Sequence, residues 1–215
     1  MSQEAQKDET TVTQFLDAVA GGSATPGGGS VSALAGCLGS ALVEMVVNLT
    51  SGKKAYEADE EELKKIREEA YSHRQSLVAT IEKDIAAYQE VMKAYLLPRQ
   101  SEEEKQVRRE TIQRSLKKAA DPPLFTVVTS LKILQLCLQA VAKGNPNTLS
   151  DAAVGALLAD AALHGGVFNV LVNLSALHDK QYVEKMKKEL RRLEREGRKI
   201  KEQIMSLVNS KIQSQ

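Results

Sequence analysis

The pattern of apolar and polar residues along this chain has the periodicity of α-helices almost from end to end. Apolar residues recur three and four positions apart, as one buried face of a helix requires. The segments with this spacing are residues 12–19, 31–50, 57–95, 101–119, 124–143, 145–173 and 179–210. Strand alternation, hairpin dipeptides and internal repeats are not evident. The pattern predicts an all-α fold, an antiparallel bundle of about six or seven helices, several of them long.

Helix-breaking residues lie between these segments. Gly21-Gly22 ends the first segment, a Gly/Pro cluster fills residues 23–30, and Pro98 follows the long segment 57–95. The run from Ser101 to Glu104 has the form of a capping box and predicts a new helix start. Asp121-Pro-Pro123 is expected to form a turn, and Gly144 to end a helix. We expect one domain over residues 1–215, with residues 1–10 frayed.

The segment 31–50 differs from the other predicted helices because it carries almost no charge. It is rich in Ala, Gly and Ser, which allow neighbouring helix backbones to approach closely. It is also apolar on all sides, so it must be covered all round. A bundle this thin can complete that cover with a second copy, and we therefore expect a homodimer.

Two carboxylates interrupt faces that are otherwise apolar or small. Asp84 lies on the stripe that Leu77, Ile81 and Tyr88 define, so it must be paired, protonated or directed at a polar cavity. A structural ion pair is the alternative to a catalytic role. Asp151 lies close to a helix start, where capping is an equally good explanation. His73, on the same stripe as Asp84, is more often a satisfied interior histidine than a catalyst.

Other polar positions are candidates for binding a ligand. Consecutive glycines before a helix let backbone N–H groups approach an anion or a polar ligand, although a tight turn with close packing explains them equally well. Asn169 and Asn173 can read a heterocycle edge or join two helices, and the lysines can hold a carboxylate or be solvated. The binding candidates are Thr25, Pro26, Gly27, Gly28, Gly29, Ser30, Lys53, Lys54, Asn169 and Asn173. The glycines match neither a P-loop nor a dinucleotide-binding fingerprint.

Composition narrows the class of protein further. With 29 Lys and Arg against 28 Asp and Glu, the net charge of +1 gives no reason to expect nucleic acid as a partner. Cys37 and Cys137 lie apart in apolar stretches without metal-ligand spacing, so we expect reduced core residues and no metal site. The first twenty residues lack a signal-peptide pattern, and the apolar runs look too interrupted to span a membrane. We expect a cytoplasmic protein.

Several motifs in register along the chain resemble one family. It is the formiminotetrahydrofolate cyclodeaminase and methenyltetrahydrofolate cyclohydrolase family, which includes the C-terminal domain of formiminotransferase-cyclodeaminase. The resemblance extends from about Phe15 to about Leu177. The segments that carry it are TPGGGS at 25–30, GKK at 52–54, DIAAY at 84–88, Ser150-Asp151 and GVFNVLVN at 166–173.

The resemblance implies an all-helical homodimer with a folate cleft and no metal or redox cofactor. Residues 25–30 would wall the cleft, and Asn169 and Asn173 would lie beside it. Lys53 or Lys54 would attract the glutamate or polyglutamate tail of a reduced folate. Asp84 and Asp151 would be its ionisable groups. The implied reactions are cyclodeamination of 5-formiminotetrahydrofolate, as in histidine breakdown, and hydrolysis of 5,10-methenyltetrahydrofolate. We expect Asp84 to transfer the proton. The alternative is a non-catalytic helical interaction module.

Overall fold

The computed structural model describes residues 10–214, and within them the chain is almost entirely helical. The α-helices are α1 (Val12–Ala20), α2 (Gly28–Asn48), α3 (Glu60–Tyr95), α4 (Glu102–Ala119), α5 (Asp121–Lys143), α6 (Leu149–Ser175) and α7 (Lys180–Gln213). Short 3-10 helices η1 (Lys54–Asp59) and η2 (Pro146–Thr148) precede α3 and α6. The predicted all-α bundle is confirmed. The fraying expected at residues 1–10 falls, apart from Thr10, outside the described residues.

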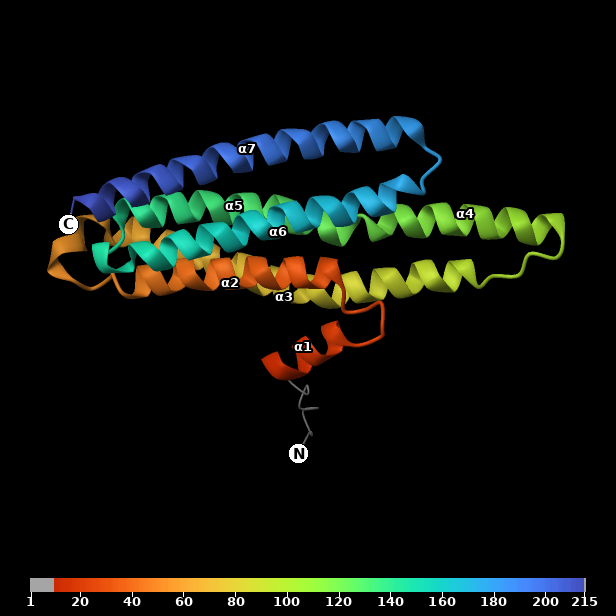
Figure 1. Ribbon diagram of the computed structural model, residues 1–215, viewed down its shortest axis with the longest axis horizontal. Helices are drawn as coiled ribbons and strands as arrows, with labels where there is room; N and C mark the ends of the chain where they lie inside the picture. The colour runs from red at the N-terminus through yellow and green to blue at the C-terminus, as the bar shows by residue number, and fades with distance from the viewer. Residues whose placement is uncertain (1–9, 215) are drawn as a thin grey trace.

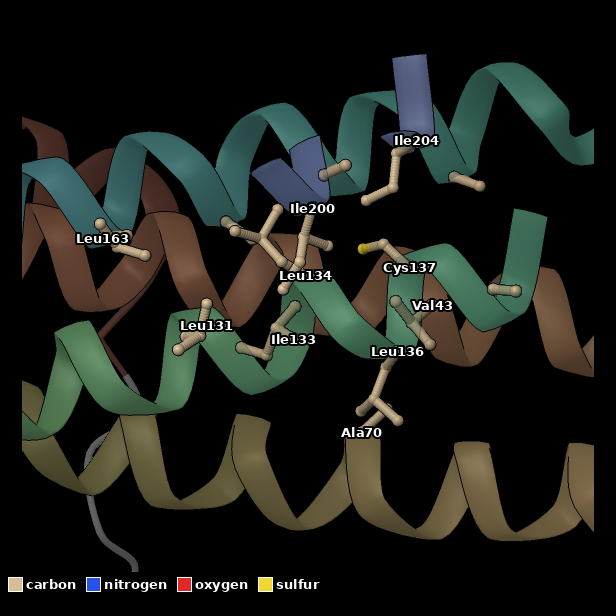
Figure 2. Close-up of a cluster of buried hydrophobic side chains, with 14 of the residues drawn as sticks. Val43, Ala70, Leu131, Ile133, Leu134, Leu136, Cys137, Leu163, Ile200 and Ile204 are labelled. Carbon is tan, nitrogen blue, oxygen red and sulfur yellow. The ribbon is translucent and has the colours of Figure 1, made fainter. Parts of the chain in front are cut away.

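The long helices lie roughly parallel to one axis, and α5 is central among them. α5 packs against α2, α3, α6 and α7. In Figure 1, α7 covers one side of the α5–α6 pair and α2 and α3 lie on the other, while α3 and α4 extend together beyond the remaining helices. Figure 2 shows Leu134, Cys137, Leu163, Ile200 and Ile204 converging from α5, α6 and α7 into one core. The core thus fixes α2, α3 and α6 relative to one another.

Small residues set the distance between α2 and α6. A Cβ atom added at Gly39 would lie 2.8 Å from the Gly155 carbonyl oxygen, and one added at Gly155 would lie 3.2 Å from the Gly39 carbonyl oxygen. The two helix backbones are therefore in direct contact, which only residues without large side chains permit. This contact confirms the interpretation of the Ala/Gly/Ser-rich segment as a closely packed helix, and it brings the first turn of α2 beside the second half of α6.

Two expectations from the sequence were wrong. Asp121-Pro-Pro123 does not form a separate turn; it forms the first turn of α5, because a proline there has no N–H that the helix needs. The second concerns the apolar runs, which look too interrupted in the sequence to span a membrane. Three stretches are nevertheless long and apolar enough to cross one by length and composition alone: Gly28–Asn48, Glu102–Lys143 and Pro146–Ser175. About half of each apolar stretch is buried inside the bundle.

The two cysteines are buried and free, as expected. Burial raises the pKa of the Cys37 thiol to about 11 and that of Cys137 to about 12. Both thiols therefore stay protonated near neutral pH, and they pack as small apolar side chains.

Candidate functional site

The first turn of α2 meets α3 at Asp84. The Ser30 hydroxyl donates a hydrogen bond of 2.9 Å to Asp84 Oδ2, and the backbone N–H of Ser30 is a second donor to the same carboxylate. Ser30 is buried, whereas Asp84 is half-buried. A carboxylate at the N-terminal end of a helix is favoured by the free N–H groups and by the helix dipole. The structure thus brings together two of the predicted elements, the triple-glycine turn and Asp84.

Glycine at position 29 is what lets this carboxylate approach the helix start. A Cβ atom added there would overlap the carboxylate of Asp84, with Oδ2 only 2.6 Å away. The N-cap residue Gly27 supplies no side chain to cap α2. The carboxylate of Asp84 therefore stands where a capping side chain normally would. Thr25 and Pro26, joined by a cis peptide bond, precede this turn and are half-buried.

Among the described residues, Asp84 is held without a cationic partner. Burial raises the pKa of its carboxyl group above the ordinary value, and the two hydrogen bonds from Ser30 oppose that rise without cancelling it. Within residues 10–214, no lysine, arginine or histidine forms an ion pair with Asp84. The structural ion pair that the sequence left open for Asp84 is therefore not found among these residues. A carboxyl group in this state can exchange a proton closer to neutral pH than an exposed aspartate does.

Of the two candidate asparagines of α6, Asn169 lies against the start of α2. A Cβ atom added at Gly28 would lie 3.4 Å from Asn169 Nδ2, so the Asn169 amide lies against the glycine turn. Asn169 Nδ2 donates to the Gly165 carbonyl at 2.8 Å, and Asn173 Nδ2 donates to the carbonyls of Ala119 and Asn169. Asn173 thus joins α6 to the end of α4, whereas Asn169 borders the site directly.

The remaining predicted site residues lie at the opposite end of α2. Lys53 and Lys54 follow the C-terminus of that helix and are exposed. Asp151 is in the first turn of α6, and this turn is tied to the same end because the Asn145 N–H donates to Thr50 Oγ1 at 2.9 Å. Ser30 and Asn48 are separated by about 27 Å along the helix at 1.5 Å per residue. One copy of the chain therefore does not bring Lys53, Lys54 or Asp151 to Asp84.

His73 occupies a separate groove between α3 and α5, in the middle of the bundle. Burial, and after it the nearby charge of Lys132, lowers the pKa of His73. The groove encloses about 420 Å³ and is bordered by Glu69 and Gln135 among others. A hollow of about 520 Å³ beside Lys117 and Tyr182 lies between α4 and the start of α7. Neither space includes Asp84.

A second polar cluster was not anticipated from the sequence. Lys201 of α7 forms an ion pair of 2.7 Å with Asp160 Oδ2 on α6, and His164 Nε2 lies 3.6 Å from Asp160 Oδ1. His164 Nδ1 is also 3.4 Å from a carboxylate oxygen of Glu194. The i,i+4 spacing of Asp160 and His164 was the available signal. The partners on α7 could not be inferred, because they depend on which face of that helix packs on α6.

The site at Asp84 therefore offers acid–base chemistry. It has one carboxyl group with a raised pKa, hydrogen-bond donors from Ser30, and an adjacent amide from Asn169. Within the described residues, no group of three or more His, Cys, Asp or Glu is arranged to hold a metal ion. A half-buried carboxyl group at a glycine-lined helix start is of the kind that can serve as a general acid or base.

Comparison with known proteins agrees with this class. The family described as formiminotransferase-cyclodeaminase matches residues 11–192. This chain belongs to that family. It is an enzyme of the cyclodeaminase and cyclohydrolase kind, as the relatives below indicate.

Three relatives show how far the likeness extends. A methenyltetrahydrofolate cyclohydrolase from Methylorubrum extorquens is 41% identical over 202 residues, which are 94% of this chain and 97% of that protein. A formimidoyltransferase-cyclodeaminase from Gallus gallus is 32% identical over 97% of this chain, which spans only 39% of that protein. The crystal structure of formiminotetrahydrofolate cyclodeaminase from Thermotoga maritima superimposes with a TM-score of 0.85 at 31% identity, covering 94% of this chain and 97% of that one.

Proposed function

We propose that this enzyme hydrolyses 5,10-methenyltetrahydrofolate to 10-formyltetrahydrofolate, with Asp84 as the proton-transfer group. The observation that carries the proposal is the half-buried carboxyl group of Asp84, which Ser30 holds at the start of α2 and whose pKa is raised by burial. The identity of 41% with a methenyltetrahydrofolate cyclohydrolase over nearly the whole of both chains supports this substrate.

The reaction requires little more than a positioned water and a base. The carbon between N5 and N10 of the substrate is already electrophilic, because it is part of a cationic amidine. Water attacks that carbon while the carboxylate of Asp84 takes one of its protons, which gives a neutral tetrahedral adduct. The adduct then loses its hydroxyl proton, the bond to N5 breaks, and N5 takes a proton from the Asp84 carboxyl group. The formyl group remains on N10, and one proton is released overall.

The neighbouring residues would orient the substrate around this carboxylate. The Asn169 amide lies beside Gly28, where its carbonyl and amino groups can pair with the polar edge of a pterin ring. Gly28 and Gly29 leave room for the ring to approach the backbone. Holding the substrate carbon and the water in place accounts for much of the expected rate enhancement. The steps assigned to Asp84 use no metal ion or redox cofactor.

Cyclodeamination of 5-formiminotetrahydrofolate is the second candidate. The likeness to the cyclodeaminase from Thermotoga maritima and to the protein from Gallus gallus favours it. In that reaction N10 attacks the formimino carbon on N5, and ammonia leaves after a general acid protonates the departing nitrogen. Asp84 in its protonated form can be that acid, because its pKa is raised. The same site thus suits both reactions, which share a tetrahedral carbon between N5 and N10.

Two assays on purified protein distinguish these candidates. Loss of the methenyl absorbance of 5,10-methenyltetrahydrofolate, measured above its spontaneous rate, reports hydrolysis. Ammonia release from 5-formiminotetrahydrofolate reports cyclodeamination. We expect the larger kcat/KM in the first assay. Activity confined to the second would replace the proposal by its alternative. Absence of both activities, together with no binding of any reduced folate by calorimetry, would favour a non-catalytic helical module.

A further inference from the structure

Four residues join the first turn of α2 to the middle of α6 in a closed ring of contacts. The Ser32 hydroxyl donates a hydrogen bond of 2.6 Å to the Gly28 carbonyl. Ser32 lies directly against Gly165, because a Cβ atom added at Gly165 would overlap Ser32 Oγ and lie 3.1 Å from Ser32 Cβ. Asn169 Nδ2 donates to the Gly165 carbonyl at 2.8 Å, and the same amide lies against Gly28. Each of the four residues therefore contacts two others, and the ring closes on the amide that borders the site.

The hydrogen bond to Gly165 determines how the Asn169 amide is oriented. A side-chain amide has an accepting oxygen at one end and two donor hydrogens on its nitrogen. Nδ2 is directed at the Gly165 carbonyl, and among residues 10–214 no group donates to Oδ1 of Asn169. The reversed amide would set two oxygen atoms against each other and leave the Gly165 carbonyl without this donor. Oδ1 of the half-buried Asn169 is therefore an oriented hydrogen-bond acceptor beside Gly28.

Ser32 and Gly165 control where this acceptor lies relative to the glycine turn. Ser32 is buried, and the hydrogen bond to the Gly28 carbonyl four residues earlier fixes the rotamer of its side chain. A larger residue at position 165 would push the Ser32 hydroxyl off that carbonyl or move α6 away from α2. The hydrogen bonds to Asp84 come from Ser30 instead. The ring thus sets the Asn169 side of the site separately from the carboxylate side.

We propose that Ser32 and Gly165 are positioning residues, which hold Asn169 Oδ1 where it accepts a hydrogen bond from the ring of the substrate. This inference rests on the proposed function and deepens it. The amino group and ring N–H groups of a pterin are donors, so an accepting oxygen fits that end of the substrate. Asn169 then fixes the ring while Asp84 acts at the reacting carbon. A ring without a donor at this position would bind weakly, because it would leave the oriented oxygen unpaired.

Calorimetry with tetrahydrofolate, kept anaerobic, tests this arrangement without turnover. Asn169→Ala should weaken binding by about 10- to 100-fold, because the acceptor is lost. Ser32→Ala should weaken binding by about 5- to 10-fold, because the amide is present but less well held. In an Asn169→Ala background, Ser32→Ala should have almost no further effect, since its effect passes through the amide. An equal loss from Ser32→Ala in both backgrounds would overturn the inference.

Ser40→Ala is the matched control. Ser40 is also a buried serine of α2, and its hydroxyl donates a hydrogen bond of the same length, 2.6 Å, to the Ala70 carbonyl. It lies about 12 Å further along the helix than Ser32, at 1.5 Å per residue. Its removal should lower stability but change the affinity for tetrahydrofolate by no more than about twofold, because distant sites act independently. A loss of affinity as large as in Ser32→Ala would show that binding merely follows stability, and it would overturn the inference.

Steady-state kinetics on 5,10-methenyltetrahydrofolate give a second readout. Ser32→Ala and Gly165→Ala should each raise KM by about 5- to 10-fold and change kcat no more than about threefold, since Asp84 keeps its hydrogen bonds. A lower kcat at unchanged KM in Ser32→Ala would overturn the inference. Wild-type protein that neither binds tetrahydrofolate nor has activity would contradict the proposed function and remove this inference with it. Wild-type protein that binds, with undiminished affinity in Ser32→Ala, would overturn this inference alone.

Discussion

Two aspartates on interior faces of this bundle, Asp84 and Asp160, have opposite surroundings. Asp160 pairs with Lys201 at 2.7 Å and lies near His164, whereas among residues 10–214 the partner of Asp84 is Ser30, which donates hydrogen bonds to it. Burial without a cation raises the pKa of Asp84. The ion pair of Asp160 with Lys201 joins α6 to α7. The raised pKa lets the Asp84 carboxyl group exchange a proton, which is why we propose a catalytic role for Asp84 and a structural one for Asp160.

The largest expected effect is on the activity of Asp84→Asn. The amide keeps the shape of the side chain but cannot accept the proton of the attacking water, so kcat should fall at least about 100-fold. Steady-state kinetics on 5,10-methenyltetrahydrofolate measure this. Asp160→Asn is the matched control. It should change kcat no more than about threefold, because the proposed proton transfers do not use Asp160. A folded Asp84→Asn enzyme with near-normal kcat would remove Asp84 from the mechanism.

A smaller loss of activity is expected for Gly29→Ala. The added methyl group would overlap the Asp84 carboxylate and displace it from the start of α2. Because misplacing a catalytic group is costly, kcat/KM should fall by about 10- to 100-fold. Gly22→Ala is the control, since a Cβ atom there meets nothing within 4 Å. Equal activity of the two variants would mean that the carboxylate tolerates the shift or that its position is unimportant.

Asp160→Asn should instead change stability. Lys201 would lose its charged partner in a half-buried position, so the free energy of unfolding should fall by about 1–3 kcal/mol. Urea titration followed by circular dichroism measures the change. Adding Lys201→Met should recover part of it, because the unpaired ammonium group is then removed as well. An unchanged unfolding midpoint in Asp160→Asn would show that the ion pair does not hold α7 to α6.

The smallest expected effect is the pH dependence of stability at Asp84. Its pKa is raised in the folded state, so the folded protein keeps this proton to a higher pH than the unfolded chain does. Stability is therefore lost as pH rises through the folded pKa of this group. Asp84→Asn lacks that loss, and its stability relative to wild type should be greater near pH 7 than near pH 4, about the ordinary pKa of aspartate. The opposite trend in urea unfolding would indicate an unrecognised cation beside Asp84.

The helices could be predicted from the sequence because their apolar spacing is regular, and Asp84 because it interrupts such a spacing. The arrangement of the site could not. Lys53 and Asp151 are far from Asp84 in the sequence, and they are also far from it in the folded chain. The antiparallel packing of α2 against α3 and α6 places them at the opposite end of α2. Asp160 was missed because its cation lies on α7, at Lys201. The spacing of apolar residues in the sequence shows which face of a helix is buried. The contacts between side chains of different helices depend on how those faces pack.

The pH dependence of kcat in wild type and in Ser30→Ala tests most directly whether the ionisation of Asp84 controls the reaction. As a base, Asp84 must be deprotonated, so kcat should fall below an apparent pKa that is higher than the ordinary aspartate value of about 3.9. The Ser30 hydroxyl lowers the pKa of Asp84, and its removal should therefore move that limb to higher pH. Two results would contradict a proton-transfer role for Asp84. One is that kcat falls at the same apparent pKa in both enzymes; the other is that kcat shows no apparent pKa above the ordinary aspartate value.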